Sequence, residues 1–202
     1  MSNLNVLVGC EESQAVCIEF RKLGHAAFSC DLLKSSGGHP EWHLQMDVFK
    51  AIKLKKWGLG IFFPPCTYLT VSGNKWYKDQ PLRKSGALVG AKRREARKRA
   101  IRFFMKLYFS KIPLVCVENP VGVISTKFKK PDQVIQPWMF GHGETKATCL
   151  WLKGLSKLLP TNIVSGRKQK LHYLSPSKDR AILRSKTYPG IAKAMATQWG
   201  KC

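Results

Sequence analysis

The sequence predicts an α/β fold with a mostly parallel sheet. Several short stretches are continuously apolar, without the alternating polar residues of a strand that faces water on one side. Segments whose apolar residues recur at helical spacing lie between them, and this alternation is typical of a parallel sheet covered by helices on both faces. With 202 residues, the chain can bury one good core but is too short to promise two full domains.

The chain opens with a predicted strand, turn and helix. Residues 4–9 (LNVLVG) form a continuous apolar run that ends in Gly9. In residues 11–23 the side chains of Ala15, Ile18 and Leu23 recur at roughly helical spacing. Further short apolar runs predict strands over residues 25–32, 42–47, 57–63 and 112–117.

A longer helix is predicted over residues 91–109, where an apolar stripe that includes Phe104 and Tyr108 lies mostly apart from the arginines. A strand over 147–152 and a short helix over 187–199 follow, and the basic residues 154–180 between them have little periodicity. We therefore expect a core over 1–153, a short basic insert over 154–184, and a C-terminal helix over 185–202 that packs back on the core.

The composition favours a polyanionic partner. The chain has 35 Lys and Arg residues against 12 Asp and Glu, and its net charge of +23 exceeds what solubility requires. Nucleic acid is the expected partner, although a solvated cationic surface or a ribosome or membrane contact would have the same composition. Because the sequence shows neither an export signal nor an apolar run of about 20 residues, we expect the protein in the cytoplasm of a cell.

The cysteines indicate neither a disulfide framework nor a zinc site, since the seven are an odd number without a CxxC pair. The histidines show no ligand spacing, so no metal is expected. Cys66 differs from the rest because it follows Pro64 and Pro65 directly after an apolar run, and two prolines end a strand and fix the backbone. In a cationic field such a thiol is predicted to have a lowered pKa, whereas a buried turn cysteine is the alternative.

Acidic residues follow several of the predicted strands. Asp31, Asp47 and Glu118 stand at run ends, together with Gly9 and Cys66. Ligands of open α/β sheets bind beyond the carboxyl ends of the strands, so these residues predict a site for a nucleoside. Each acid alone could instead be a helix cap or a turn residue.

Two of these segments resemble motifs of the cytosine-5 methyltransferase family. Residues 64–73 (PPCTYLTVSG) are similar to its nucleophile loop, and residues 117–120 (VENP) to its Glu-Asn motif, in the same order and at a matching separation. The resemblance implies a Rossmann-like, S-adenosylmethionine-dependent methyltransferase fold. It further implies that Cys66 adds to C6 of cytosine while Glu118, with Asn119 beside it, holds or protonates N3, so that C5 takes the methyl group.

The resemblance covers most of the chain. Residues 143–152 (GETKATCLWL) are similar in position to the family's Gln-Arg-Arg strand, with Lys146 as the remaining base contact, and residues 187–196 resemble the closing helix. Asp31 would hold the ribose hydroxyls and Asp47 would contact the adenine amine. The cofactor-binding residues implied in this way are Gly9, Cys10, Glu11, Glu12, Asp31, Leu32, Asp47 and Pro64.

The sequence departs from the family pattern at three places, and each departure has a consequence for the expected site. The first turn (VGCEESQ) lacks the second glycine of the usual Phe-x-Gly-x-Gly pattern, so Glu11 or Glu12 is expected to meet the methionine part of the cofactor. Most arginines of the Gln-Arg-Arg strand are replaced, which leaves the anchoring of the nucleophile loop open. The small insert implies a short or relaxed recognition sequence. In this the chain resembles small phage-encoded members, which implies the cytoplasm of a bacterium or of a phage-infected host cell.

The expected substrate is duplex DNA with a flipped cytosine, bound by a monomer without a metal and without a membrane. Residues 72–90 would form a mobile lid over the extruded base. The alternatives are a related C5-pyrimidine modification of RNA or of a free nucleotide, a different one-carbon donor, and an inactive relative that binds DNA through charge. The residues expected to contact DNA are Lys75, Arg93, Arg94, Arg97, Arg167, Lys168 and Lys170.

Overall fold

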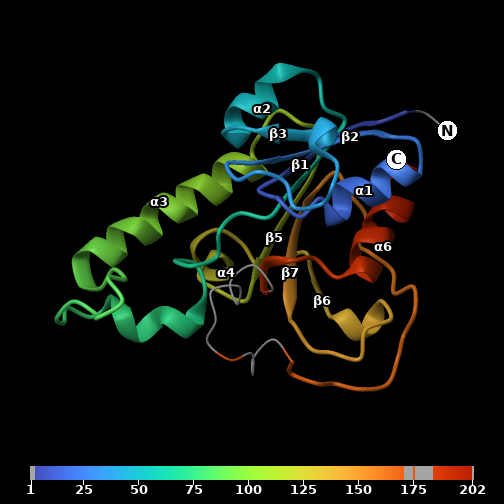
Figure 1. The fold of residues 1–202 in the computed structure, drawn as a ribbon. Coiled ribbons are helices and arrows are strands. Elements are labelled where there is room, and N and C mark those ends of the chain that lie inside the picture. The colour runs from blue at the N-terminus through green and yellow to red at the C-terminus, as the bar shows by residue number, and fades with distance from the viewer. Residues whose placement is uncertain (1–2, 171–174, 176–183, 202) are drawn as a thin grey trace.

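The structure, a computed structural model, describes residues 3–170, 175 and 184–201. Its described residues form a seven-stranded sheet of order β3-β2-β1-β4-β5-β7-β6 (Figure 1). The neighbouring strands from β3 to β5 pair in parallel, and β7 is antiparallel to both β5 and β6. The predicted α/β fold with a mostly parallel sheet is therefore confirmed. The strands are β1 Asn5–Gly9, β2 Ala26–Asp31, β3 His43–Gln45, β4 Leu59–Phe62, β5 Leu114–Pro120, β6 Gln133–Ile135 and β7 Thr148–Lys153.

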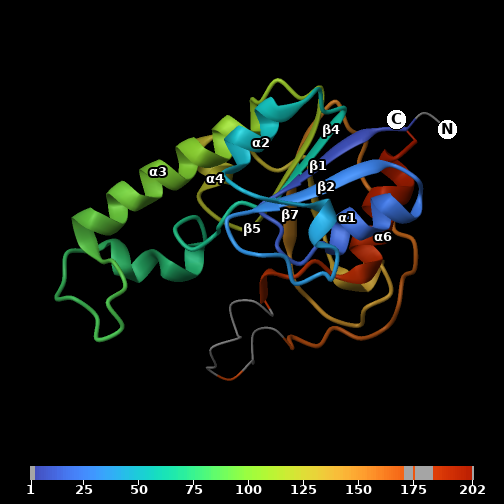
Figure 2. The same cartoon turned by 45° about the horizontal axis from the view of Figure 1, so that its top comes forward.

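Helices cover both faces of the sheet (Figures 1 and 2). The α-helices are α1 Ala15–Lys22, α2 Val48–Leu54, α3 Gly90–Tyr108, α4 Ile124–Lys127 and α6 Pro189–Trp199. The alternation of side chains along β1 explains the two layers: Val6 and Val8 pack with residues of α1 and α6, whereas Leu7 packs with residues of α2 and α3. The sheet is thus buried on both faces, as its continuous apolar runs predict.

Strand β5 is longer than the predicted strand over residues 112–117. It continues through Glu118, Asn119 and Pro120 because β7 runs beside it, and Glu118 pairs with Leu150. Helix α1 is shorter than predicted, since it begins at Ala15. The backbone before it bends through Cys10 and Gln14, both with left-handed φ values near 60°.

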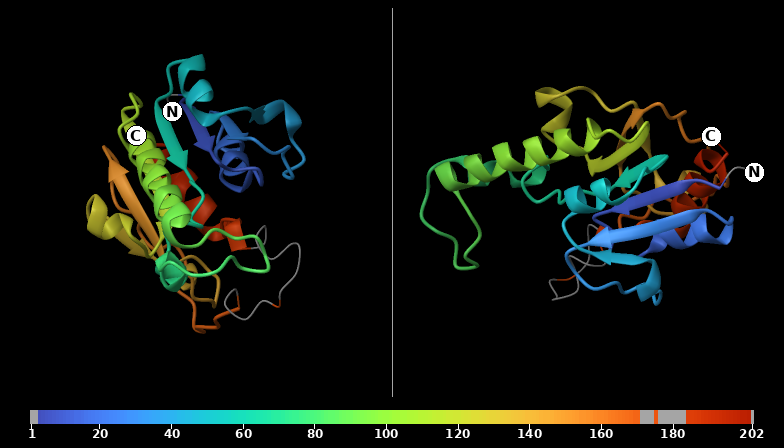
Figure 3. Two further views of the ribbon diagram at one scale, coloured as in Figure 1. Left: turned by 90° about the vertical axis from the view of Figure 1, so that its left-hand side faces the viewer. Right: turned by 90° about the horizontal axis from the view of Figure 1, so that it is seen from above.

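Helix α3 extends beyond the sheet. Its C-terminal half packs on the sheet through Phe104 and Leu107, which are fully buried. Its N-terminal end and the neighbouring segment before it extend away from the body of the molecule (Figures 1 and 3). That segment contains the 3-10 helix η2, Val71–Tyr77, which packs on α3. Part of the expected lid over 72–90 is therefore a helical turn held on α3.

The predicted insert begins as part of the core rather than outside it. Leu158 is buried, and its backbone exchanges two hydrogen bonds with the side chain of Gln133 in β6, at 2.7 and 2.8 Å. Its described portion up to Lys170 contains no helix and no strand beyond isolated bridges. Most of the remaining residues predicted for the insert, 171–174 and 176–183, lie outside the described residues.

Two further features of the described residues bear on function. None of their helices is both long enough and apolar enough to pass through a lipid bilayer. None of their His, Cys, Asp and Glu side chains form a group of three or more that could hold a metal ion.

Candidate active site

Cys66 lies at the rim of the sheet, just beyond β4. The amide of Phe63 donates to the carbonyl of Gly9 at 3.0 Å, which holds the end of β4 against β1. After the buried Pro64, the carbonyl of Cys66 accepts hydrogen bonds from the amides of Leu69 at 2.9 Å and Thr70 at 3.1 Å. The chain therefore turns at Cys66, and its side chain is exposed.

Asn119 connects this turn to the neighbouring strand. Its side-chain Nδ2 donates to the carbonyl of Pro64 at 2.9 Å, and only 1% of the residue is exposed. Because Asn119 belongs to β5, this bond ties the segment that carries Cys66 to the strand that carries Glu118. The Oδ1 atom of Asn119 is buried and has no hydrogen-bond partner among the described residues.

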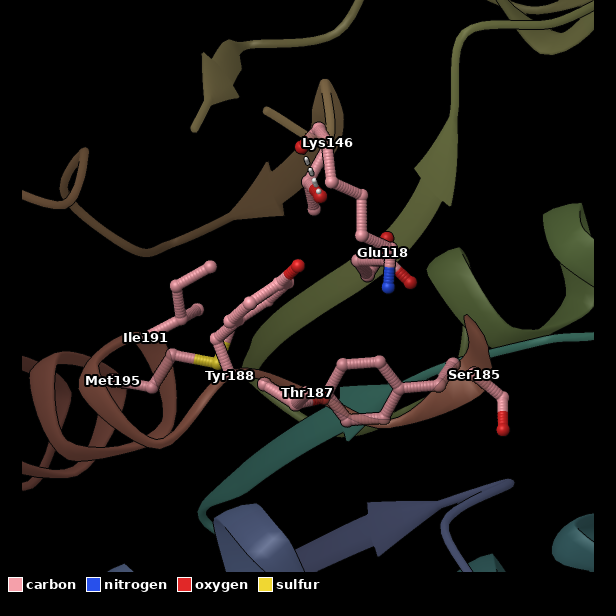
Figure 4. Close-up of a pocket in the computed structure, with 9 residues that line it drawn as sticks. Glu118, Lys146, Ser185, Thr187, Tyr188, Ile191 and Met195 are labelled. Atoms are coloured by element: carbon pink, nitrogen blue, oxygen red, sulfur yellow. Dashed lines mark hydrogen bonds between the residues drawn. The ribbon is translucent and has the colours of Figure 1, made fainter. Parts of the chain in front are cut away.

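The side chain of Glu118, near the carboxyl end of β5, lines a pocket (Figure 4). The empty volume of the pocket is about 280 Å³, part of which is open to solvent. Figure 4 shows the side chain of Lys146 extending toward the carboxyl of Glu118, with Thr187 and Tyr188 across the pocket. The Lys146 ammonium donates to the carbonyls of Arg184 at 3.0 Å and Lys186 at 3.5 Å. The lining residues are Phe63, Glu118, Lys146, Thr148, Ser185, Thr187, Tyr188, Ile191 and Met195.

Burial raises the pKa of the Glu118 carboxyl, and nearby Lys146 opposes this rise. A carboxyl with a raised pKa keeps its proton to higher pH, so it can donate a hydrogen bond or a proton to a ring nitrogen. Glu118 is thus suited to act as an acid at the pocket.

The thiol of Cys66 differs from the prediction, because its pKa is raised rather than lowered. Although the residue is exposed as a whole, surrounding protein displaces water from the sulfur and disfavours its charged form. The carboxylate of Glu118 raises the pKa further, whereas Lys146 and Arg184 lower it. The many other cations of the chain therefore do not activate this thiol in the protein as it stands. Glu118 and Lys146 are thus near enough to influence the charge of the Cys66 sulfur.

A second group of candidate residues meets at the ends of β1, β2 and β3. Burial raises the pKa of Cys10 to about 12, and Asp31, Cys30 and Asp47 add to this rise. Asp31 and Asp47 therefore lie near Cys10, as expected for residues at one edge of a parallel sheet. Leu32, which follows Asp31, is 72% exposed.

The carboxylates of this group fit the polar parts of a nucleoside. Asp31 Oδ1 accepts from the amide of Leu33 at 3.0 Å, and Asp47 Oδ1 accepts from the amides of Phe49 and Lys50 at the start of α2. In the described part of the chain, the other oxygen of each carboxylate makes no hydrogen bond, so each has an acceptor left for a hydroxyl or an amine. Asp47 thus caps helix α2, the alternative role considered for it from the sequence, and its second oxygen is still available to a ligand.

Glu11 and Gly9 have structural roles that the sequence did not indicate. The carboxylate of Glu11 accepts from the amides of Val16 at 2.8 Å and Cys17 at 3.3 Å, so it caps α1 instead of facing a ligand. Burial raises the pKa of Glu11 to about 7 in spite of these bonds. Gly9 is required by packing, since a Cβ there would lie 2.6 Å from the ring of Phe62. The adjacent Glu12 is half-buried, and it remains the acid available for a cationic ligand group.

Two of the three arginines expected to contact DNA from α3 point toward the protein. Arg93 is 5% exposed, and it donates to the carbonyls of Leu88 and Thr67. Arg97 donates to the carbonyl of Tyr68 at 2.9 Å. The expectation of phosphate contacts is corrected for both, because most of their donors bind other groups of the protein, among them backbone carbonyls close to Cys66. The more exposed Arg94 donates to the carbonyl of Tyr77 and pairs with Asp79 at 3.2 Å.

The other expected DNA contacts are exposed. Lys75 and Arg167 lie over the rings of Trp76 and Trp138, at 4.9 and 4.0 Å from the ring centroids. The backbone of Lys168 forms an isolated β-bridge with that of Glu144, and the Lys170 ammonium is 3.8 Å from the Glu144 carboxylate. These four side chains remain accessible to a polyanion.

Sequence reasoning missed the inward direction of Arg93 and Arg97, although a signal for it exists. Both residues continue the helical stripe that runs through Ile101, Phe104 and Tyr108, at spacings of three and four residues. It also missed the pocket residues Thr187 and Tyr188 individually, although the segment that contains them was expected to return to the core.

Comparisons with known proteins add a structural likeness. The sequence matches no protein-family model and no curated protein. The fold is similar to the crystal structure of an E. coli protein that is encoded within a prophage and described as a candidate DNA modification methyltransferase. The TM-score is 0.50 at 12% sequence identity, and the match covers 86% of this chain and 56% of that one. The chain thus spans a little over half the length of that protein, and the likeness shows that the two share a Rossmann-like α/β fold.

Proposed function

We propose that this chain transfers a methyl group from S-adenosylmethionine to C5 of cytosine in DNA, through a covalent adduct with Cys66. The observation that carries the proposal is the hydrogen bond from Asn119 to the carbonyl of Pro64, at 2.9 Å. It ties the turn of Cys66 to the strand of Glu118, which supports a nucleophile and an acid that act together on one base. The fold shared with a candidate DNA modification methyltransferase supports the reaction class.

Cys66 and Glu118 would divide the chemistry of the base between them. The sulfur of Cys66 adds to C6 of the ring after it has lost its proton, and the positive charges of Lys146 and Arg184 favour that loss. Glu118, whose pKa is raised by burial, holds N3 and donates a proton to it. Protonation at N3 keeps the adduct neutral and leaves C5 nucleophilic. After C5 has taken the methyl group, its hydrogen leaves as a proton to solvent and the Cys66 sulfur leaves C6 as a thiolate, which restores the ring.

Asn119 acts indirectly on this step. By holding the carbonyl of Pro64, it fixes the distance and direction between the sulfur of Cys66 and the pocket of Glu118. Lys146 contributes a positive charge, and its ammonium is oriented by the carbonyls of Arg184 and Lys186. These residues position the two reacting groups before the base arrives.

The group around Cys10 would bind the methyl donor. Asp31 holds the ribose hydroxyls through its available oxygen, Asp47 accepts from the adenine amine, and Glu12 meets the ammonium of the methionine part. Leu32, exposed beside Asp31, covers the adenine ring. S-adenosylmethionine supplies an electrophilic methyl group on a sulfonium sulfur when it is bound.

DNA would contact the exposed cations of the arm formed by η2 and α3. Residues 71–99 contain ten Lys and Arg residues against two acids, a much higher density of positive charge than in the rest of the chain. On the outer face of α3 the exposed Lys98, Arg99 and Arg102 share one carboxylate, Glu95, at 3.6 to 4.0 Å. Apart from Arg93 and Arg97, which point toward the protein, these cations are available for phosphates, and the arm begins beside Cys66.

A methylation assay tests the proposal. Duplex DNA is incubated with the protein and labelled S-adenosylmethionine, then digested to nucleosides, and 5-methylcytosine is quantified. Wild-type protein should form it, Cys66→Ser should form none, and Glu118→Gln should be at least about 100-fold slower because the amide cannot give a proton to N3. Label in N4-methylcytosine or N6-methyladenine would contradict the assigned chemistry, and label in RNA alone would contradict the assigned substrate.

A further inference from the structure

The segment that carries Cys66 is held from α3 as well as from β5. Arg97 makes the central contacts: its Nε donates to the carbonyl of Tyr68 at 2.9 Å, and its Nη2 donates to Asn74 Oδ1 at 2.9 Å and to the carbonyl of Thr70 at 3.5 Å. One guanidinium thus holds three points within eight residues of Cys66. A planar fork of donors suits this arrangement better than an ammonium would.

Aromatic rings complete the contact. The Arg97 guanidinium lies 3.5 Å from the centroid of the Tyr77 ring, and the hydroxyl of Tyr77 donates at 2.8 Å to the same Tyr68 carbonyl that Arg97 holds. The guanidinium of Arg93 lies 5.2 Å from the ring centroid of Tyr68 and 4.9 Å from that of Tyr77. The rings and the two guanidinium groups therefore fix one another's positions.

Arg93 holds the segment one residue closer to Cys66. Its Nη2 donates to the carbonyl of Thr67 at 3.3 Å, and its Nη1 to that of Leu88 at 3.1 Å. It is buried, and no carboxylate of the described residues pairs with it. Carbonyl oxygens and aromatic rings around it compensate its charge, while its Nε has no hydrogen-bond partner among these residues. Gly73 leaves room for it, because a Cβ at that position would lie 2.7 Å from Nη2.

We propose that Arg97 and Arg93 are positioning residues, which anchor residues 66–77 on α3 and thereby set the place of the Cys66 sulfur relative to Glu118. The inference rests on the proposed function for its catalytic consequence, but not for its geometry. Residues 143–152, which resemble the family's Gln-Arg-Arg strand, contain no arginine, and in this chain the anchor of the Cys66 segment lies on the helix that follows it. Since both arginines bind backbone carbonyls, the anchor fixes the path of the chain directly.

The test compares Arg97→Met with Lys106→Met. Lys106 is a matched control, because it is an exposed cation of the same helix that also lies over a ring, 4.6 Å from the centroid of Phe49, away from the Cys66 segment. The first measurement is the single-turnover rate of adduct formation with duplex DNA that contains 5-fluorocytosine. We expect Arg97→Met to be about 10- to 100-fold slower, with DNA affinity changed by less than about threefold, because misplacing a reacting group by 1 Å can cost about 100-fold. Lys106→Met should stay within about twofold of wild type.

The second measurement needs neither DNA nor cofactor. The alkylation rate of Cys66 is followed against pH through the mass of its own peptide. In the anchored segment, burial and Glu118 raise the pKa of this thiol, while Lys146 and Arg184 oppose them. Releasing the segment exposes the sulfur and moves it away from Glu118, so the midpoint should shift to lower pH in Arg97→Met. A merely structural role elsewhere would not shift this midpoint.

Two conservative variants complete the design. Arg97→Lys keeps the charge over the Tyr77 ring but loses the fork, and its adduct rate should lie between those of wild type and Arg97→Met. Should Arg97→Met fail to fold, Tyr77→Phe removes only the hydroxyl bond to the Tyr68 carbonyl and should change both measurements in the same direction, by a smaller amount.

The outcomes are distinct. The anchor would be overturned if Arg97→Met formed the adduct at the wild-type rate and kept the wild-type alkylation midpoint. The same result in Tyr77→Phe would overturn it if Arg97→Met does not fold. An equal loss of adduct rate in Lys106→Met would also overturn it. If wild-type protein forms no adduct at all, the proposed function fails, whereas a shifted midpoint in the variants would still support the anchor.

Discussion

Replacing Asn119 by Ala should weaken the connection between Cys66 and Glu118 by a calculable amount. The variant loses the 2.9 Å bond to the carbonyl of Pro64 and a 3.1 Å bond to the carbonyl of Glu118. Leaving a buried acceptor unpaired costs about 1 to 3 kcal/mol. The Oδ1 atom removed with the side chain has no partner in the described part of the chain, so its removal breaks no hydrogen bond there. We therefore expect the free energy of unfolding to fall by about 1 to 2 kcal/mol, which for a chain of this size lowers Tm by about 2 to 8 °C.

The activity of Asn119→Ala should fall by more than its stability suggests. Rates of adduct formation are measured well below the midpoint of unfolding, and we expect a loss of about 10-fold or more because the sulfur is no longer held at the pocket. Gln198→Ala is the control, since that side chain also exchanges two bonds with a backbone segment, at Leu159, but far from Cys66. An Asn119→Ala protein that is destabilised as predicted yet reacts at the wild-type rate would refute this reasoning.

Three further predictions concern the cofactor site, a buried acid and the basic arm. Asp31→Ala should weaken S-adenosylmethionine binding in calorimetry while DNA affinity stays nearly unchanged; unaltered cofactor affinity would leave Asp31 as a turn residue. The folded protein holds the Glu11 proton up to about pH 7, whereas the unfolded chain releases it near pH 4.5. The stabilisation of the folded state by this protonated carboxyl is therefore fully present below pH 4.5 and is lost as the pH rises toward 7. In urea unfolding, the free energy of unfolding of wild type should accordingly fall by about 3 kcal/mol relative to that of Glu11→Gln between pH 4.5 and pH 7. Parallel plots of this free energy against pH for the two proteins would contradict the prediction. The slope of log DNA affinity against log salt should shrink by about 2 to 3 when three exposed cations of α3 are replaced by Met, and an unchanged slope would place the DNA elsewhere. The three are Lys98, Arg99 and Arg102.

Much of the fold could be predicted because buried parallel strands have a distinct pattern. Val6, Leu7 and Val8 read as one apolar run, since neighbouring side chains face opposite helical layers. Strand β6 could not be predicted in this way, because three residues do not show a period. The length of β5 depends on β7 lying beside it, which is a property of the folded chain.

The edge that holds the candidate site was also predictable, but the partners of individual side chains were not. Acids that follow parallel strands must meet at one edge of the sheet, which brings Asp31 and Asp47 near Cys10. The direction of a long side chain is decided by tertiary partners instead. Glu11 was expected at a ligand and caps α1, and Arg93 was expected at phosphates and holds the backbone near Cys66.

The central claim, that Cys66 attacks cytosine during methyl transfer, is tested most directly by trapping. Wild-type protein is incubated with S-adenosylmethionine and duplex DNA in which 5-fluorocytosine replaces cytosine, because the fluorine at C5 prevents release of the enzyme after transfer. The account predicts a covalent protein–DNA complex that depends on the cofactor, carries one added methyl group, and maps by mass spectrometry to Cys66. A complex that maps to another cysteine, or none at all from protein that binds both DNA and S-adenosylmethionine, would contradict it.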